Sequence, residues 1–245
     1  PLPDGVVIYS VKKPYKPTGG LRVLGGNLSP EYSAVLKLAG VEGGLEDNVF
    51  SGRARVFDSE AKLLSALEGQ PDQFQNLDMI IVRYEGPSGA PGMPEMLDST
   101  SRITTLCRQR GIVVGLMTDA RFSGGSVGLV IGHVGPEAAL GGPIALVEND
   151  DNIIVDLNKN EVNCVELQDK TTFNARKAAW DAEVDKNGGT HPSIGDVDTR
   201  LLNRMRRSAV SAIFGAGMHP DRKVWVCEPR EGLKSEFTPS NKYRT

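Results

Sequence analysis

Apolar positions follow three different patterns in the first half of the chain. Residues 79–82 (Met-Ile-Ile-Val) and 112–117 are continuous apolar runs, which is typical of strands buried on both faces. Residues 53–57 instead alternate between arginine and apolar side chains, which predicts a strand with one polar face. Residues 60–68 place three leucines on one side of a helix that ends at Gly69. Strands that alternate with helices predict mixed α/β layers.

The same patterns predict the remaining elements. Asp58 or Ser59 is the expected N-cap of the helix at 60–68. A second helix is expected from Pro94 to about residue 110, because proline suits the first helical turn and Gly111 ends it. The other expected elements are strands at 21–24, 33–41, 143–147, 152–157 and 161–167, and helices at 171–185 and 198–214.

The chain divides into three expected parts. Residues 1–20 are rich in proline and glycine and predict an arm or linker. Residues 21–170 contain the alternating strands and helices of the α/β domain. Residues 171–245 predict a helical extension that ends in a polar, proline-containing tail.

Composition narrows the class of protein. The net charge of −3 predicts no nucleic-acid partner, and no run approaches the roughly 18 apolar residues of a membrane helix. The start shows no charged and apolar signal segment. Cys107, Cys164 and Cys227 lie far apart without C-x-x-C or zinc spacing, which predicts reduced thiols in a cytoplasmic protein. The chain does not begin with methionine, which leaves open that it is a piece of a longer protein.

Glycine is concentrated in the middle of the chain, and two polar residues stand out there. Residues 86–142 hold 12 of the 28 glycines, a density typical of tight turns or close approach to a ligand. Glu95 follows the apolar run at 79–82, and Ser123 follows the run at 112–117. A helical crossover predicts that these strands are parallel, so both loops are expected at the carboxyl edge of the sheet, where α/β proteins bind ligands.

The residues alone leave simpler interpretations open. Glu95 suits the dipole in the first turn of a helix, and Ser123 suits an ordinary turn. His133 has apolar neighbours, as a core histidine does, and Asp119 and Arg121 can pair with each other. One carboxylate does not make a Mg²⁺ site, and the chain has no P-loop, G-x-G-x-x-G or G-x-S-x-G motif.

Longer motifs add a family resemblance. They are residues 18–28 (Thr-Gly-Gly-Leu-Arg-Val-Leu-Gly-Gly-Asn-Leu), 82–87 (Val-Arg-Tyr-Glu-Gly-Pro), 91–96 (Pro-Gly-Met-Pro-Glu-Met), 118–125 (Thr-Asp-Ala-Arg-Phe-Ser-Gly-Gly), 132–138 (Gly-His-Val-Gly-Pro-Glu-Ala) and 141–145 (Gly-Gly-Pro-Ile-Ala). In this order and spacing they resemble the C-terminal part of the dihydroxy-acid and sugar-acid dehydratases. The resemblance covers about residues 14 to 180.

The resemblance implies a fold, a reaction and two site residues. The fold is a swivelling β/β/α barrel-like domain, a mixed sheet with flanking helices, that closes over a larger N-terminal domain. That domain holds most Mg²⁺ ligands and the cysteines of an iron–sulfur cluster, [2Fe-2S] or [4Fe-4S]. The reaction removes water from a 2,3-dihydroxy acid to give a 2-keto-3-deoxy acid. By motif, Glu95 is the implied Mg²⁺ ligand from this domain, and Ser123 is the implied alkoxide base that removes the C2 proton.

Two positions depart from the common family pattern. The family usually reads T-D-G-R and H-V-S-P-E-A, whereas this chain has Ala120 and Gly135. These variants and the extension after residue 170 favour a sugar acid of the xylonate or gluconate type as substrate. The alternative is the dihydroxy acid of branched-chain amino-acid synthesis. The expected substrate contacts are Asp119, Arg121, Gly124 and His133.

The cluster-binding cysteine motifs of the family do not occur in these 245 residues. We therefore expect the C-terminal domain of a longer hydro-lyase, inactive alone, that docks on the cluster-bearing N-terminal domain and forms homo-oligomers. A non-catalytic docking domain or subunit is the rival hypothesis.

Overall fold

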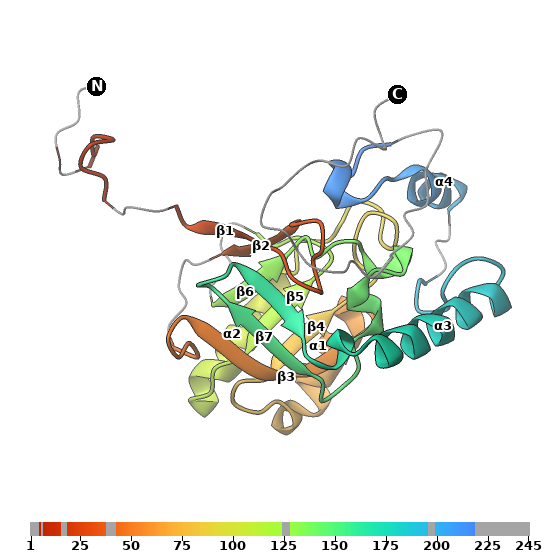
Figure 1. Ribbon diagram of the computed structural model, residues 1–245, viewed down its shortest axis with the longest axis horizontal. Helices are drawn as coiled ribbons and strands as arrows, with labels where there is room; N and C mark the ends of the chain where they lie inside the picture. Colours follow the sequence, from red (N-terminus) through yellow and green to blue (C-terminus); the bar gives the residue numbers. More distant parts are fainter. Residues whose placement is uncertain are drawn as a thin grey trace.

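An eight-stranded mixed sheet forms the body of the protein in the computed structural model (Figure 1). The structure describes residues 5, 7–15, 19–37, 43–123, 128–195 and 199–218. The strands lie in the order β1-β2-β6-β5-β4-β3-β7-β8, and β3, β4, β5 and β6 run parallel to one another. Their bounds are β1 Leu21–Leu24, β2 Ala34–Lys37, β3 Val49–Phe57, β4 Met79–Val82, β5 Gly115–Thr118, β6 Leu129–Gly132, β7 Asn152–Asp156 and β8 Glu161–Cys164.

The two ends of the sheet come together and nearly close it. Gly25, directly after β1, forms a parallel bridge with Glu161 of β8. The Gly25 N–H donates to the Asn160 carbonyl at 2.8 Å, and the Val162 N–H donates back to the Gly25 carbonyl at 2.8 Å. Closing a sheet on itself removes unpaired strand edges. The barrel-like mixed α/β fold expected from the sequence is therefore confirmed.

The sheet separates two hydrophobic clusters. Side chains alternate across a strand, so in β4 Met79 and Ile81 join the cluster inside the barrel. Ile80 and Val82 join the second cluster, beneath the helices α1 (Glu60–Gly69) and α2 (Leu97–Arg110). Both faces of β4 are therefore buried, which confirms the interpretation of its continuous apolar run.

Within the described residues, four α-helices and five 3₁₀ turns accompany the sheet. Besides α1 and α2 they are α3 Lys170–Lys186, α4 Arg200–Ser208, η1 Pro71–Gln73, η2 Ala138–Leu140, η3 Pro143–Leu146, η4 Glu166–Gln168 and η5 Ala212–Phe214. Ser59 caps α1 by accepting the Lys62 N–H, and Gly111, at φ 63°, ends α2. In Figure 1, α3 extends away from the sheet, and of its residues only Phe173 is buried. Within the described ranges, no helix has the length and apolar character to cross a membrane.

The structure corrects several predicted elements. The helix expected from Pro94 begins at Leu97, because Met93 and Met96 both adopt left-handed backbone conformations (φ 52°) with buried side chains. The segment expected as a strand at 143–147 is instead the 3₁₀ turn η3. Pro143 has no N–H to donate to a neighbouring strand. The Arg83 guanidinium donates to the carbonyls of Ala145 and Val147, so these carbonyls are not available to a strand partner.

Other boundaries also differ from the prediction. The helix expected at 198–214 ends at Ser208, because the chain turns back: the Val210 N–H donates to the Gly217 carbonyl, and Ser211 caps η5. The strand β6 was not predicted, since its short apolar run is bounded by glycines. The strand expected at 33–41 is observed as β2, and positions 38–42 lie outside the described residues.

Candidate functional site

The parallel strands end together, and their loops meet at one edge of the sheet. Phe57 of β3 is in register with Val82 of β4, and Val82 is in register with Thr118 of β5. The loops that follow β4, β5 and β6 therefore lie side by side. This is the carboxyl edge at which open α/β sheets bind ligands, and it is where the sequence places Glu95 and Ser123.

The structure brings Glu95, Arg121 and Ser123 together. The Ser123 N–H donates to the Glu95 carbonyl at 3.3 Å. Arg121 donates through Nε to the Met93 carbonyl at 2.9 Å, and its Nη1 lies 3.0 Å from Glu95 Oε1. The Glu95 side chain is 50% exposed, so its carboxylate is open to a ligand. Glu95 lies in a loop and not in a helix, so the helix-dipole interpretation of this residue is wrong.

Asp119 sits beneath these loops with no exposed surface. Its Oδ1 accepts the Glu85 N–H at 3.0 Å, and its Oδ2 accepts the N–H groups of Tyr84 and Ala138, each at 3.0 Å. Burial raises the pKa of Asp119 to about 7, although the three N–H donors oppose this shift; the nearby Glu137 carboxylate adds to it. The carboxylate thus joins the loops that follow β4, β5 and β6.

His133 follows β6 and is half-buried at the same edge. Its N–H donates to the Ala120 carbonyl at 2.8 Å, which ties the loop after β6 to the loop after β5. Burial lowers the pKa of His133, and the charge of Arg121 lowers it further, so both favour the neutral imidazole. Arg121 and His133 stay predictions as substrate contacts. Gly124 lies outside the described residues.

Glu137 also belongs to this edge, and the sequence analysis assigned it no role. It is completely buried, and its Oε1 accepts the Ala212 N–H at 2.5 Å. Its Oε2 is buried without a hydrogen-bond partner among the described residues. Gly86 is required beside it, because a Cβ at that position would lie 2.6 Å from the Glu137 Cγ. A single carboxylate within an apolar stretch was the signal that could have marked it.

The donor groups at this edge fit one of the two implied cofactors. The accessible carboxylate of Glu95 is an oxygen ligand of the kind that Mg²⁺ prefers, and the rest of its coordination must come from elsewhere. The two described cysteines do not fit an iron–sulfur cluster here. Cys107 lies on α2, and Cys164 is buried on β8 with its thiol toward Asp151 and Glu166.

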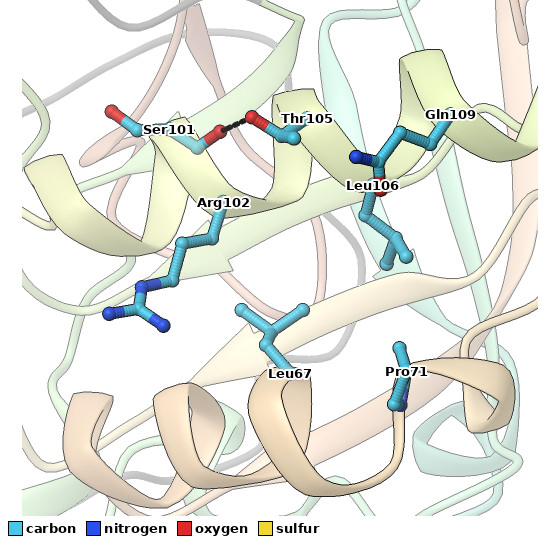
Figure 2. A pocket seen from close by; sticks show the side chains of 7 residues that line it. All are labelled: Leu67, Pro71, Ser101, Arg102, Thr105, Leu106 and Gln109. Atoms are coloured by element: carbon cyan, nitrogen blue, oxygen red, sulfur yellow. Dashed lines mark hydrogen bonds between the residues drawn. The ribbon is translucent and has the colours of Figure 1, made fainter.

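Two other features of the described chain lie away from this edge. A groove of about 380 Å³ runs between α1 and α2 (Figure 2). Three of its polar side chains are already paired: Thr105 donates to the Ser101 carbonyl at 2.9 Å, Ser101 donates to the Leu97 carbonyl at 2.8 Å, and Arg102 binds Asp98. Asp151, Cys164 and Glu166 also gather within 4.8 Å of one another. Arg176 donates to both carboxylate oxygens of Asp151, so an ion pair already neutralises that group.

Comparison with known proteins places this geometry in a family. Residues 6–216 match the family model described as "Dihydroxy-acid/6-phosphogluconate dehydratase C-terminal". A dihydroxy-acid dehydratase of Pyrobaculum aerophilum is 50% identical over 156 residues, which cover 64% of this chain and 26% of that protein. The corresponding enzyme of Francisella tularensis subsp. novicida is 46% identical over 183 residues, covering 75% of this chain and 31% of that protein.

A third relative extends the match. The dihydroxy-acid dehydratase of Pyrobaculum neutrophilum is 42% identical over 189 residues, covering 77% of this chain and 32% of that protein. The chain spans about a quarter to a third of the length of these curated relatives. The family is one of dehydratases, which are hydro-lyases, and the matched model describes its C-terminal part. The chain therefore belongs to the dihydroxy-acid/6-phosphogluconate dehydratase family and corresponds to its C-terminal domain.

Proposed function

We propose that this chain is the C-terminal domain of a longer enzyme that removes water from a 2,3-dihydroxy acid to give a 2-keto acid. The observation that carries the proposal is the contact between the Ser123 amide and the Glu95 carbonyl at the carboxyl edge. It joins the loop that carries the Ser123 hydroxyl to the loop that carries the open carboxylate of Glu95. The relatives named dihydroxy-acid dehydratase support the reaction class.

Ser123 is the proposed general base. The C2–H bond of the substrate breaks, the proton passes to the Ser123 oxygen, and the electron pair forms a C2=C3 double bond. The C3–O bond breaks with its electron pair, and the departing hydroxide takes up a proton and leaves as water. Ser123 releases its proton to restore the alkoxide, and the resulting enol becomes the 2-keto acid. A serine hydroxyl needs a lowered pKa for this role, and bound Mg²⁺ would favour the alkoxide. We assign activation of the C3 hydroxyl to the rest of the longer enzyme.

Glu95 is the proposed Mg²⁺ ligand of this domain. Bound Mg²⁺ would polarise the substrate and acidify its C2 hydrogen. Arg121 holds the Glu95 carboxylate at 3.0 Å and the neighbouring Met93 carbonyl at 2.9 Å. The arginine thus orients the carboxylate and offsets its charge while no metal is bound.

The proposed substrate is the dihydroxy acid of branched-chain amino-acid synthesis. Ala120, Gly135 and the extension after residue 170 favour a sugar acid as substrate. The comparisons do not support that preference specifically, because the relatives described above are named dihydroxy-acid dehydratases. A sugar acid becomes the alternative that the experiment must separate.

The proposed partner is an N-terminal domain that holds the iron–sulfur cluster and the other Mg²⁺ ligands. The length of the relatives supports this, since this chain matches no more than 32% of the three described above. Apolar side chains near the start of the described chain also support it. Val11 is 97% exposed, Leu21 65% and Val23 54%, a pattern typical of a surface that another domain or subunit covers. Homo-oligomers would fit the same surface.

The test is formation of 2-keto acid by the longer enzyme, purified without oxygen and supplied with Mg²⁺. We expect turnover of 2,3-dihydroxyisovalerate in preference to xylonate and gluconate. Ser123→Ala should reduce kcat about 10²- to 10⁴-fold, the range typical of losing a general base. Turnover of aldonates alone would move the enzyme to the sugar-acid branch. No turnover of any acid by a metal-loaded enzyme would favour the docking-domain hypothesis.

A further inference from the structure

We propose that Asp119 is a positioning residue: its buried carboxylate holds the loops that carry Glu95 and Ser123 in register with the loop after β6. The role of these loops in catalysis rests on the proposed function. The contacts that hold the loops are observed in the structure. Asp119 has no exposed surface, so it acts through the loops and not by touching the substrate.

Three N–H groups from two loops converge on this one side chain. Tyr84 and Glu85 begin the loop that leads to Glu95, and Ala138 lies in the loop after β6. Each donates to Asp119 at 3.0 Å. A charged acceptor makes such bonds stronger than neutral ones. A single carboxylate therefore supplies the acceptors for backbone groups that no strand ladder pairs.

The backbone at Tyr84 needs such a constraint. Tyr84 has a φ of 67°, which is uncommon for a bulky residue and costs free energy unless the surroundings impose it. The Tyr84 side chain is held as well, because its hydroxyl accepts the Trp180 indole N–H at 3.1 Å. The bond from the Tyr84 N–H to Asp119 stabilises the backbone at the point where the loop leaves β4.

The same short segment also holds the far end of the loop. Arg121, two residues after Asp119, donates to the Met93 carbonyl at 2.9 Å and contacts the Glu95 carboxylate. The loop from Tyr84 to Glu95 is therefore attached at its beginning by Asp119 and at its end by Arg121. Asp119 also binds the loop after β6, through the Ala138 N–H.

Asparagine cannot reproduce this arrangement. Both carboxylate oxygens of Asp119 are acceptors, one for Glu85 and the other for Tyr84 and Ala138. An asparagine keeps one oxygen and directs an NH₂ group at the remaining N–H. Leaving a buried donor without an acceptor is costly.

The test is amide hydrogen exchange of the chain at pH 8, comparing wild type, Asp119→Asn and Asp78→Asn. Asp78 is the matched control, because it is also buried and also accepts a backbone N–H, from Gln75 at 2.7 Å. It lies at the opposite end of β4. We expect the amides of Tyr84, Glu85 and Ala138 to be protected in wild type. They should exchange at least about tenfold faster in Asp119→Asn, as loss of a bond worth about 1.4 kcal/mol predicts. Asp78→Asn should leave their rates unchanged relative to those of the β4 amides, which report any loss of global stability.

A kinetic measurement on the longer enzyme separates positioning from general stability. Asp119→Asn should raise the Mg²⁺ concentration for half-maximal activity about tenfold, whereas Asp78→Asn should not change it. Equal exchange rates at the three amides in the two variants, or unprotected amides in wild type, would overturn the proposal. The exchange measurement does not depend on catalysis. Fast exchange in Asp119→Asn therefore supports the positioning role even if the enzyme turns over no dihydroxy acid and the proposed function fails.

Discussion

The two ends of the same parallel strands bury a carboxylate in opposite ways. At the amino edge, Asp78 precedes β4 and accepts the Gln75 N–H, but it also meets two arginines: Arg55 Nε at 3.2 Å and Arg53 Nη2 at 3.6 Å. At the carboxyl edge, Asp119 follows β5 and meets, among the described residues, three backbone N–H groups and no arginine, with the Glu137 carboxylate nearby. One negative charge is neutralised by side chains, whereas the other is held by the main chain of the loops.

The two carboxylates therefore have different roles: Asp78 contributes to stability, whereas Asp119 fixes the positions of loops. An ion pair with arginine compensates a buried charge, but it does little to orient a distant loop. A carboxylate that accepts several main-chain N–H groups fixes the path of the segments that donate them. The loops with Glu95 and Ser123 are held in this second way, by a carboxylate that accepts main-chain N–H groups. At the amino edge the carboxylate is held mainly by arginine.

The largest expected effect concerns Glu95, at the carboxyl edge. Glu95→Gln should reduce activity of the longer enzyme by at least about 10²-fold, because a metal's polarisation of the substrate is worth several kcal/mol, and added Mg²⁺ should restore part of it. Glu68→Gln is the matched control, since Glu68 is also an accessible glutamate paired with an arginine, Arg102. Steady-state kinetics at varied Mg²⁺ measures both. Equal effects of the two substitutions would remove the special role of Glu95.

The second prediction concerns pH and Asp119. Its folded-state pKa of about 7 lies above the ordinary value of 3.8. Its contribution to stability is therefore fully present below about pH 4 and is lost as pH rises through about 7. Relative to Asp119→Asn, the free energy of unfolding of wild type should fall over that window by up to about 4 kcal/mol. Denaturant unfolding at several pH values measures the difference, and a pH-independent difference would contradict the prediction.

The third prediction concerns the amino edge. Asp78→Asn should lower the free energy of unfolding by about 1–3 kcal/mol, because it removes the buried charged acceptor of Arg55 and of the Gln75 N–H, while Asp150 still pairs with both arginines. Thermal or urea unfolding measures the loss. The loops at the carboxyl edge should not be affected, so the kinetic constants of the longer enzyme should stay within twofold of wild type. A change in Mg²⁺ dependence would show that the two edges are not independent.

The smallest expected effect concerns Gly135, where the family commonly has serine. A Cβ at Gly135 would lie 2.9 Å from the Ser33 hydroxyl and 3.1 Å from the Ile213 side chain. Gly135→Ser should therefore destabilise the protein by about 1–3 kcal/mol through overpacking. Proteolysis of the segment around Ile213, compared with wild type, shows whether that segment is displaced. Unchanged stability and cleavage would mean that the neighbours make room without cost.

Much of the fold could be predicted because its signals are local. The continuous apolar run of β4 predicted burial on both faces, and Ser59 and Gly111 marked helix ends through their own backbone preferences. The start of α2 could not be predicted in this way. Proline at 94 suits the first turn of a helix. However, Met93 and Met96 have buried side chains and left-handed backbone conformations, so the helix begins only after Met96.

The candidate site was partly predictable for a similar reason. Parallel strands and their crossover predicted that Glu95 and Ser123 would share an edge, and the bond between their backbones confirms that they do. The part played by Asp119 depends on N–H groups 35, 34 and 19 residues away. A pattern of residue types along the chain carries no information on such distant partners, so only the folded structure reveals it.

The bond between the Ser123 amide and the Glu95 carbonyl has a consequence for motion. Because each loop is fastened to the other, the proposed base and the proposed metal ligand would move together in any rotation of this domain relative to the proposed N-terminal domain. Closure then needs one rotation to deliver both groups, instead of two independent loop rearrangements. The open and closed enzyme would differ along one coordinate, with the internal geometry of the pair set before a substrate arrives.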